Sequence, residues 1–268
     1  MNRVINIIML LTCLLSFSAC DLYMSPNGDP EDVNIKIERY DRLQSRYLTT
    51  GDYVALKSMN ITYPTETRTL IENVLQLGTV DQPNINETLL NFYRDTTLQK
   101  IIIEAEKQYA IMDDINMQMS KAFQNLKKKI PNIAIPKIYT QIGALNQSII
   151  VGDESIGICL DKYLGTEFEP YRKYYFDYQI NSMTREYIVP DCLTFYILSC
   201  YPLKNFEVAK QEIRDRHMGR IMWVVNEILE KEFYSGQYVK HTERYMSKNR
   251  NVSIERLLGG NSSVNTSH

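Results

Sequence analysis

The residues of this chain that could bind a metal ion or assist catalysis are few and far apart. Its three histidines are His217, His241 and His268, and no two of them stand four positions apart. A zinc protease of the His-Glu-x-x-His type needs that spacing, because it places both imidazoles on one helix face beside the glutamate that activates water. No Glu directly follows any of the three. The sequence therefore predicts no metal site and no cofactor, and His217 is expected to be a partly buried histidine with its hydrogen bonds satisfied.

Nucleophilic and acid–base chemistry is also weakly supported. Cys159, Cys192 and Cys200 lie in apolar surroundings, where a free thiol behaves as a small hydrophobe. We expect no disulfide; if one forms, Cys159 with Cys192 is the preferred pair. Cys159 has no neighbouring histidine to activate it. Asp153, Glu154 and Asp161 could form a carboxylate pair, but turn chemistry and helix capping explain them with fewer assumptions.

Cys20 stands in a context that predicts covalent modification. Arg3 is followed by a mostly apolar stretch at residues 4–17, about 14 residues long, which matches the apolar region of a signal peptide and is too short to cross a bilayer. The sequence FSAC at residues 17–20 resembles a bacterial lipobox, in which the cysteine is acylated and becomes the new N-terminus. An ordinary signal peptide with an incidental cysteine and a buried N-terminal helix are the alternatives.

This interpretation divides the chain into four parts. Residues 1–19 are a lipoprotein signal peptide, and residues 20–32, with two Pro and three Asp, are a flexible tether. Residues 33–258 are a globular domain, and residues 259–268 are a polar, disordered tail. Acyl chains on Cys20 would hold the protein on a membrane of the cell envelope, facing the periplasm or the surface. The sequence does not decide between inner and outer membrane.

Composition excludes one class of partner. The chain carries 30 Lys and Arg against 32 Asp and Glu, with no basic stripe, so no nucleic-acid partner is expected. The 19 tyrosines against one tryptophan are unusual. Tyrosine combines an apolar ring with a polar tip, so the excess fits either the edges of a core or an interaction surface.

Apolar periodicity predicts a mostly helical α+β single domain with a small β-sheet or hairpin. Residues 33–40 alternate apolar and polar side chains, as a half-buried strand does. Further strands are expected at residues 138–143, 148–151 and 155–160. Helices are expected as short pieces in residues 41–64, then at 64–77, after an N-cap at Asn86, over 96–124 as one bent or two separate helices, and at 184–200, 204–233, around Tyr245 and at 252–258.

Residues 165–178 form an aromatic-rich loop or short helix. We expect it to be an interaction surface, because exposed tyrosine-rich patches are typical of interfaces. The residues proposed for this surface are Phe168, Tyr171, Tyr174, Tyr175 and Tyr178.

Several blocks, in order, resemble the gliding-motility-associated lipoprotein B family of Bacteroidetes. They are IKIERYD, YPTET, GICLDKYLG, PYRKYY, MTREYIVPDCL and HMGRIMWVVNEIL, and they span most of residues 35–233. The resemblance implies an envelope lipoprotein connected with surface motility. It also implies a distant, zincin-like similarity to predicted zinc proteases, with the metal motif lost.

The sequence thus predicts a lipid-anchored envelope protein that is not an enzyme and acts through contacts with other envelope proteins. The first alternative is an atypical zinc-metallopeptidase-like enzyme with a site near residues 152–161 and Asp191. A glycan-binding lipoprotein is the second, and it would need a groove lined by aromatic rings.

Overall fold

Helices surround a small mixed sheet in residues 33–260, the part of the chain that the computed structural model describes. The sheet contains β1 (Lys137–Gln141), β2 (Ile149–Val151) and β3 (Ser155–Cys159), in the order β1-β3-β2. β2 and β3 form an antiparallel hairpin, and β1 runs parallel to β3. All three predicted strands are confirmed. Most residues of β1 and β3 are buried, because helices cover both faces of the sheet.

Residues 40–129 form the first group of helices. The elements are α2 (Tyr40–Thr50), α3 (Tyr53–Thr62), α4 (Pro64–Arg68), a π-helical turn η1 (Thr69–Val74), α5 (Ile85–Phe92), α6 (Thr96–Gln108) and α7 (Asp113–Lys129). The short helices expected in residues 41–64 are thus confirmed, and residues 96–124 belong to two helices. Asp95 is the N-cap of α6, since its carboxylate accepts hydrogen bonds from the backbone amides of Thr97 and Leu98.

Two predictions in this half are wrong. Asn86 is not an N-cap: α5 begins at Ile85, and Asn84 precedes it without a side-chain cap. Residues 33–37 form no strand, and of the predicted strand only Glu38 pairs with the sheet, through an isolated parallel bridge to Tyr139. Side chains of α7 take the hydrogen bonds that a neighbouring strand would supply, as where the Ile35 amide donates to the Ser120 hydroxyl at 2.9 Å. The predicted alternation still holds for burial, with Ile35 and Ile37 both inside.

The second half of the chain is also mainly helical. Its elements are the 3-10 turns η2 (Leu160–Lys162), η3 (Glu169–Lys173), η4 (Arg185–Tyr187) and η5 (Phe206–Val208), and the helices α8 (Asp177–Ile180), α9 (Ile188–Cys200), α10 (Gln211–Leu229), α11 (Gln237–Lys248) and α12 (Ile254–Gly259). The helix predicted over 204–233 is shorter at both ends, because Asn205 and Glu230 adopt left-handed backbone conformations. Gly259 ends α12, so the predicted tail does not begin at residue 259.

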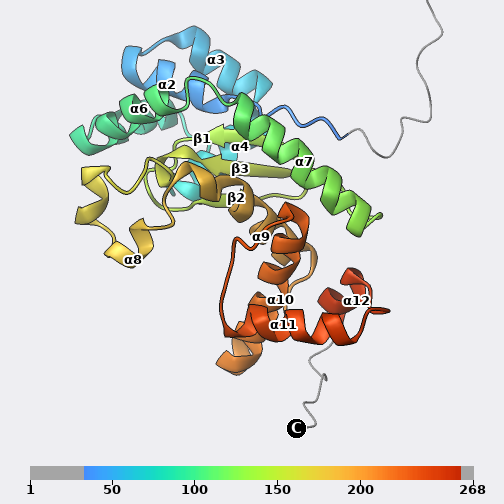
Figure 1. The fold of residues 1–268 in the computed structure, drawn as a ribbon. Coiled ribbons are helices and arrows are strands. Elements are labelled where there is room, and N and C mark those ends of the chain that lie inside the picture. The colour runs from blue at the N-terminus through green and yellow to red at the C-terminus, as the bar shows by residue number, and fades with distance from the viewer. Residues whose placement is uncertain (1–32, 261–268) are drawn as a thin grey trace, which may run out of the picture. The chain divides into compact units, whose positions relative to one another are not determined.

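Figure 1 shows the helices as two groups on opposite sides of the sheet. α2, α3 and α6 lie on one side, and α9 leads to α10, α11 and α12 on the other, with α7 contacting both α9 and α10. The core is continuous through both groups. The mostly helical α+β fold is therefore as predicted; the zincin-like outline stays a prediction.

Many of the tyrosines belong to this core. Five are fully buried, and each of their hydroxyls has a partner: Tyr40, Tyr93, Tyr109, Tyr163 and Tyr171. The Tyr109 hydroxyl, for example, donates to the Tyr163 carbonyl at 2.5 Å and so joins α6 to the segment after β3. Large apolar rings fill the space between layers, while three of the hydroxyls bond to buried backbone carbonyls and two to side chains.

Candidate functional site

The aromatic segment at residues 165–178 divides into a buried and an exposed part. Tyr171 is fully buried, so its assignment to an interaction surface is wrong. Its hydroxyl donates to the Asp161 carbonyl at 2.6 Å and accepts the Leu164 amide at 2.8 Å. Phe168 packs edge-on against Tyr171 and is partly buried. Tyr175 is also half-buried, and its hydroxyl donates to the Leu145 carbonyl at 2.5 Å.

The exposed part of this segment consists of Tyr174, Phe176 and Tyr178, which we call the aromatic patch. Their exposed fractions are 50%, 71% and 73%. The rings of Phe176 and Tyr178 stack, with centroids 5.9 Å apart and an interplanar angle of 8°. Phe176 lies in the 165–178 segment proposed as the surface but was not among the residues named for it. Its aromatic type marked it as a candidate, but only the structure shows that it faces solvent.

The acidic residues of the 152–161 region do not form a pair. Asp153 and Glu154 are exposed in the turn between β2 and β3, whereas Asp161 is fully buried. The Asp161 carboxylate accepts the backbone amides of Gly143 at 2.7 Å and Leu145 at 2.5 Å. Burial raises the pKa of Asp161, and these two amide bonds oppose that effect. This carboxylate therefore fixes the turn after β1 in place.

Asp191 lies apart from these residues, on α9. Its carboxylate accepts hydrogen bonds from the hydroxyls of Tyr163 at 2.9 Å and Tyr234 at 3.2 Å. Burial raises the pKa of Asp191 to about 6, and the two hydroxyls oppose this shift. The carboxylate borders a cavity of about 360 Å³ whose wall also contains Lys162 and Tyr178. The cavity is therefore adjacent to the aromatic patch.

The cysteines of the described chain are free thiols. Cys159 and Cys192 are buried, and burial raises the pKa of both, which keeps them protonated and unreactive at neutral pH. Cys200 is exposed, contrary to the apolar setting expected from the sequence. Within residues 33–260, no group of three His, Cys, Asp or Glu side chains is arranged to hold a metal ion. Cys20 and the predicted signal peptide and tether lie outside the described residues.

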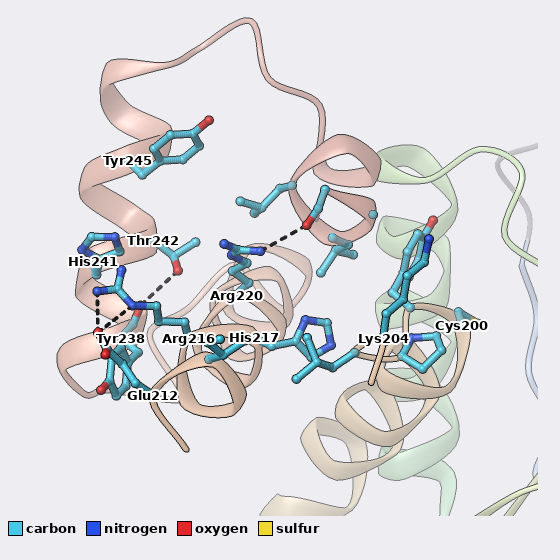
Figure 2. Close-up of a pocket in the computed structure, with 18 residues that line it drawn as sticks. Cys200, Lys204, Glu212, Arg216, His217, Arg220, Tyr238, His241, Thr242 and Tyr245 are labelled. Carbon is cyan, nitrogen blue, oxygen red and sulfur yellow. Dashed lines mark hydrogen bonds and ion pairs between the residues drawn. The ribbon is translucent and has the colours of Figure 1, made fainter. Parts of the chain in front are cut away.

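A second, larger cavity lies between the C-terminal helices, and Figure 2 shows the side chains around it. We call it the C-terminal pocket; its volume is about 440 Å³. Residues 200–204, α10, α11 and α12 each contribute to its wall. Arg220 and His217 project from α10 into the space between α11 and the 200–204 segment. Sequence reasoning did not identify this site, because its walls come from four segments with no shared motif.

The C-terminal pocket carries positive charge that the described chain does not neutralise. Arg216 forms an ion pair with Glu212 at 2.7 Å. Arg220 is half-buried and forms no ion pair within residues 33–260; its contact with the Gly260 carbonyl is long, at 3.5 Å. Burial lowers the pKa of His241, and nearby arginines lower it further, which indicates a positive potential around the pocket. Lys204 adds a further cation to the wall.

The prediction that the hydrogen bonds of His217 are satisfied is wrong. It is buried, with 7% of its surface exposed, but its Nε2 atom has no hydrogen-bond partner among the described residues. The ring is hydrogen-bonded to the backbone of Tyr201. Burial lowers the pKa of His217, the Tyr201 bond opposes this, and Arg220 adds to the lowering. The neutral imidazole is therefore favoured near pH 7, with one nitrogen facing the pocket unsatisfied.

Comparison with known proteins places the chain in a family. Residues 24–235 match the family described as Gliding motility protein GldB, and this region is more than half of the 268 residues. The chain belongs to the GldB family. Family membership relates it to gliding-motility lipoproteins and confirms the resemblance seen in the sequence blocks. No curated protein and no solved structure gives a significant match.

The family match and the described fold bear differently on the two candidate regions. The aromatic patch lies inside the matched residues, whereas α11 and α12, which form two walls of the C-terminal pocket, lie beyond residue 235.

Within residues 33–260, none of the helices combines the length and the apolar character that crossing a bilayer requires.

Proposed function

We propose that this chain is a lipid-anchored protein of the cell envelope that acts through contacts with other envelope proteins, in an assembly of the gliding-motility type, and not as an enzyme. The observation that carries the proposal is the GldB family match over residues 24–235. Cys20, in its lipobox-like context, supplies the anchor.

The aromatic patch supports a role in protein contacts. Exposed aromatic rings are enriched in the centres of protein interfaces and often contribute much of the binding energy. Phe176 and Tyr178 are already stacked in the free chain, so binding would cost them little rotamer freedom. The ring of Tyr174 is half exposed beside them in sequence.

The state of the buried carboxylates supports a non-catalytic role. Asp161 is engaged by two backbone amides and Asp191 by two tyrosine hydroxyls. A general base needs a lone pair directed at substrate, whereas these oxygens accept hydrogen bonds that hold the fold together.

The contact proposal is tested by affinity purification of the full chain from membranes after brief cross-linking. We expect the Phe176→Ser/Tyr178→Ser variant to lose specific cross-linked partners that wild type retains, without loss of thermal stability. Tyr53→Ser is the matched control, because Tyr53 is 80% exposed on α3 and lies outside the patch. Equal recovery of the same partners by the double variant and wild type would reject the patch as the contact surface.

One observation favours the enzyme alternative, namely the raised pKa of Asp191 beside a cavity. Perturbed carboxylates in clefts are frequent at catalytic sites. Metal analysis of the purified full chain separates the two functions. Stoichiometric zinc that Asp191→Ala removes, while Asp161→Asn retains it, would favour an atypical metallopeptidase over the contact protein.

A further inference from the structure

The C-terminal pocket combines a cation that has no ion-pair partner in the described chain with a buried nitrogen that has no hydrogen-bond partner there. One is the Arg220 guanidinium, a permanent cation in a half-buried position. The other is His217 Nε2, which is shielded from solvent and has no hydrogen bond. Leaving a buried polar atom unpaired is costly, so such an atom beside a cavity indicates a ligand that completes it.

Arg220 specifies an anionic oxygen. The guanidinium presents several N–H donors in a planar fork that fits carboxylate and phosphate oxygens. The neighbouring Arg216 is already paired with Glu212, so Arg220 is the cation of α10 that remains available at the pocket wall. Lys204 stands on the facing segment of the wall and is not ion-paired within residues 33–260.

His217 adds a second requirement. Because the ring already bonds to the Tyr201 backbone, the neutral imidazole offers a lone pair at Nε2 and needs a hydrogen-bond donor. A carboxylate supplies oxygen acceptors for Arg220 but no donor for His217. A phosphate monoester supplies both, since one of its oxygens carries a proton in the singly ionised form and its second ionisation lies near pH 6.

Part of the remaining wall is apolar. The side chains are those of Leu203, Ile213, Leu257 and Leu258, together with the rings of Tyr201 and Tyr245. A free inorganic ion would leave this part of the pocket empty. The volume of about 440 Å³ is within the range of small-molecule sites, which is roughly 300–1,000 Å³.

From these contacts we propose that the C-terminal pocket binds a phosphate monoester carried on an apolar group, with Arg220 holding a phosphate oxygen and His217 Nε2 accepting the phosphate hydroxyl. α11 and α12 lie beyond the residues matched by the family, so this binding site goes beyond the proposed envelope function and does not depend on it.

Isothermal titration calorimetry on the full chain in a non-ionic detergent at pH 6 tests the proposal. The probes are hexyl phosphate, hexanoate, inorganic phosphate and hexanol, all used below micelle-forming concentrations. We expect hexyl phosphate to bind most tightly, because only it supplies the anion, the donor and the apolar chain. Inorganic phosphate tests for a simple anion site, and hexanol tests for a purely apolar one.

Variants then assign the contacts. We expect Arg220→Gln to weaken hexyl phosphate binding by at least about tenfold, whereas Arg244→Gln, which removes an exposed charge on α11 outside the pocket wall, changes it less than about twofold. Arg220→Lys keeps the charge but loses the planar fork of N–H donors. It replaces Arg220→Gln as the test of the phosphate contact if Arg220→Gln does not fold. His217→Phe keeps a ring and removes the acceptor, so it should weaken hexyl phosphate more than hexanoate.

The proposal is overturned if hexanoate or hexanol binds as tightly as hexyl phosphate, or if no probe binds. Tight binding of inorganic phosphate alone would reject the apolar part of the ligand. Equal effects of Arg220→Gln and Arg244→Gln would reduce the site to general electrostatic attraction and reject the assigned contact.

Discussion

Gly219 of α10 touches Tyr238 of α11 so closely that a Cβ atom on Gly219 would lie 2.5 Å from the Cβ of Tyr238 and 2.8 Å from its carbonyl carbon. The two helices therefore cross at a distance that glycine permits and other residues do not. This crossing brings α10 and α11 together beside the C-terminal pocket, whose wall includes Tyr238.

Gly219→Ala is expected to destabilise the chain by about 1–3 kcal/mol, because the added methyl group meets backbone that cannot move freely. Helix propensity alone predicts the opposite sign, a gain of about 1 kcal/mol. Gly259→Ala is the matched control, since nothing packs within 4 Å of the position that its methyl group would take. Urea unfolding of both variants checks the sign; an increase in the free energy of unfolding for Gly219→Ala would contradict the close crossing.

Asp191 is expected to make stability fall as pH rises. Its pKa is about 6 in the folded chain and about 4 when unfolded, so the folded state holds a proton between these values that the unfolded state has released. The stabilising contribution is fully present below about pH 4 and is lost as pH rises through 6, amounting to about 3 kcal/mol at most.

Asp191→Asn removes this dependence, so the variant should gain stability relative to wild type between pH 5 and pH 8 in urea unfolding. Tyr234→Phe removes a hydrogen bond that favours the ionised carboxylate. It should therefore raise the pKa of Asp191 further and move the loss of stability to higher pH. If the free energies of unfolding of Asp191→Asn and wild type differ by the same amount at pH 5 and at pH 8, the carboxylate does not hold its proton as inferred.

Gln44 is expected to contribute strongly to stability although it belongs to neither candidate region. This fully buried amide accepts from the Ile142 amide at 2.8 Å and donates to the Ile142 carbonyl at 2.7 Å, as a neighbouring strand would. Gln44→Leu leaves the Ile142 amide unpaired and should cost about 1–3 kcal/mol. Gln118→Leu on the exposed face of α7 is the control. Equal unfolding curves for the two variants would contradict this role.

Cys20 is expected to carry the membrane anchor. Cys20→Ser should abolish incorporation of labelled palmitate and move the chain from the membrane fraction to the soluble fraction, because acyl chains supply the membrane affinity. Cys13→Ser is the matched control, since it changes a cysteine within the apolar stretch and leaves the lipobox-like sequence intact. Palmitate incorporation by Cys20→Ser at the wild-type level would reject the lipobox.

The elements that were predicted correctly are those with strong local signals. β-branched runs separated by turn residues located β1, β2 and β3, and apolar periodicity located α7 and α9. The failures occurred where partners distant in sequence or local reversals of the backbone decide the outcome. Residues 33–40 have strand alternation, but Ser120 and Asn116 of α7 take the amide bonds of Ile35 and Ile37, and only Glu38 pairs with β1. α10 is shorter than its periodicity suggests, because Asn205 and Glu230 reverse the backbone.

The sequence by itself determined the family, the helical character and the lipobox-like context of Cys20, because each of these is carried by residues close together along the chain or by their order. Only the tertiary structure decided which aromatic rings face water and which groups share a pocket. Tyr171 and Tyr174 are three positions apart and chemically identical, yet one is buried and the other half exposed. Arg220 and Tyr201 share a pocket wall because α9, α10 and α11 pack together, and that packing depends on contacts that sequence spacing does not encode.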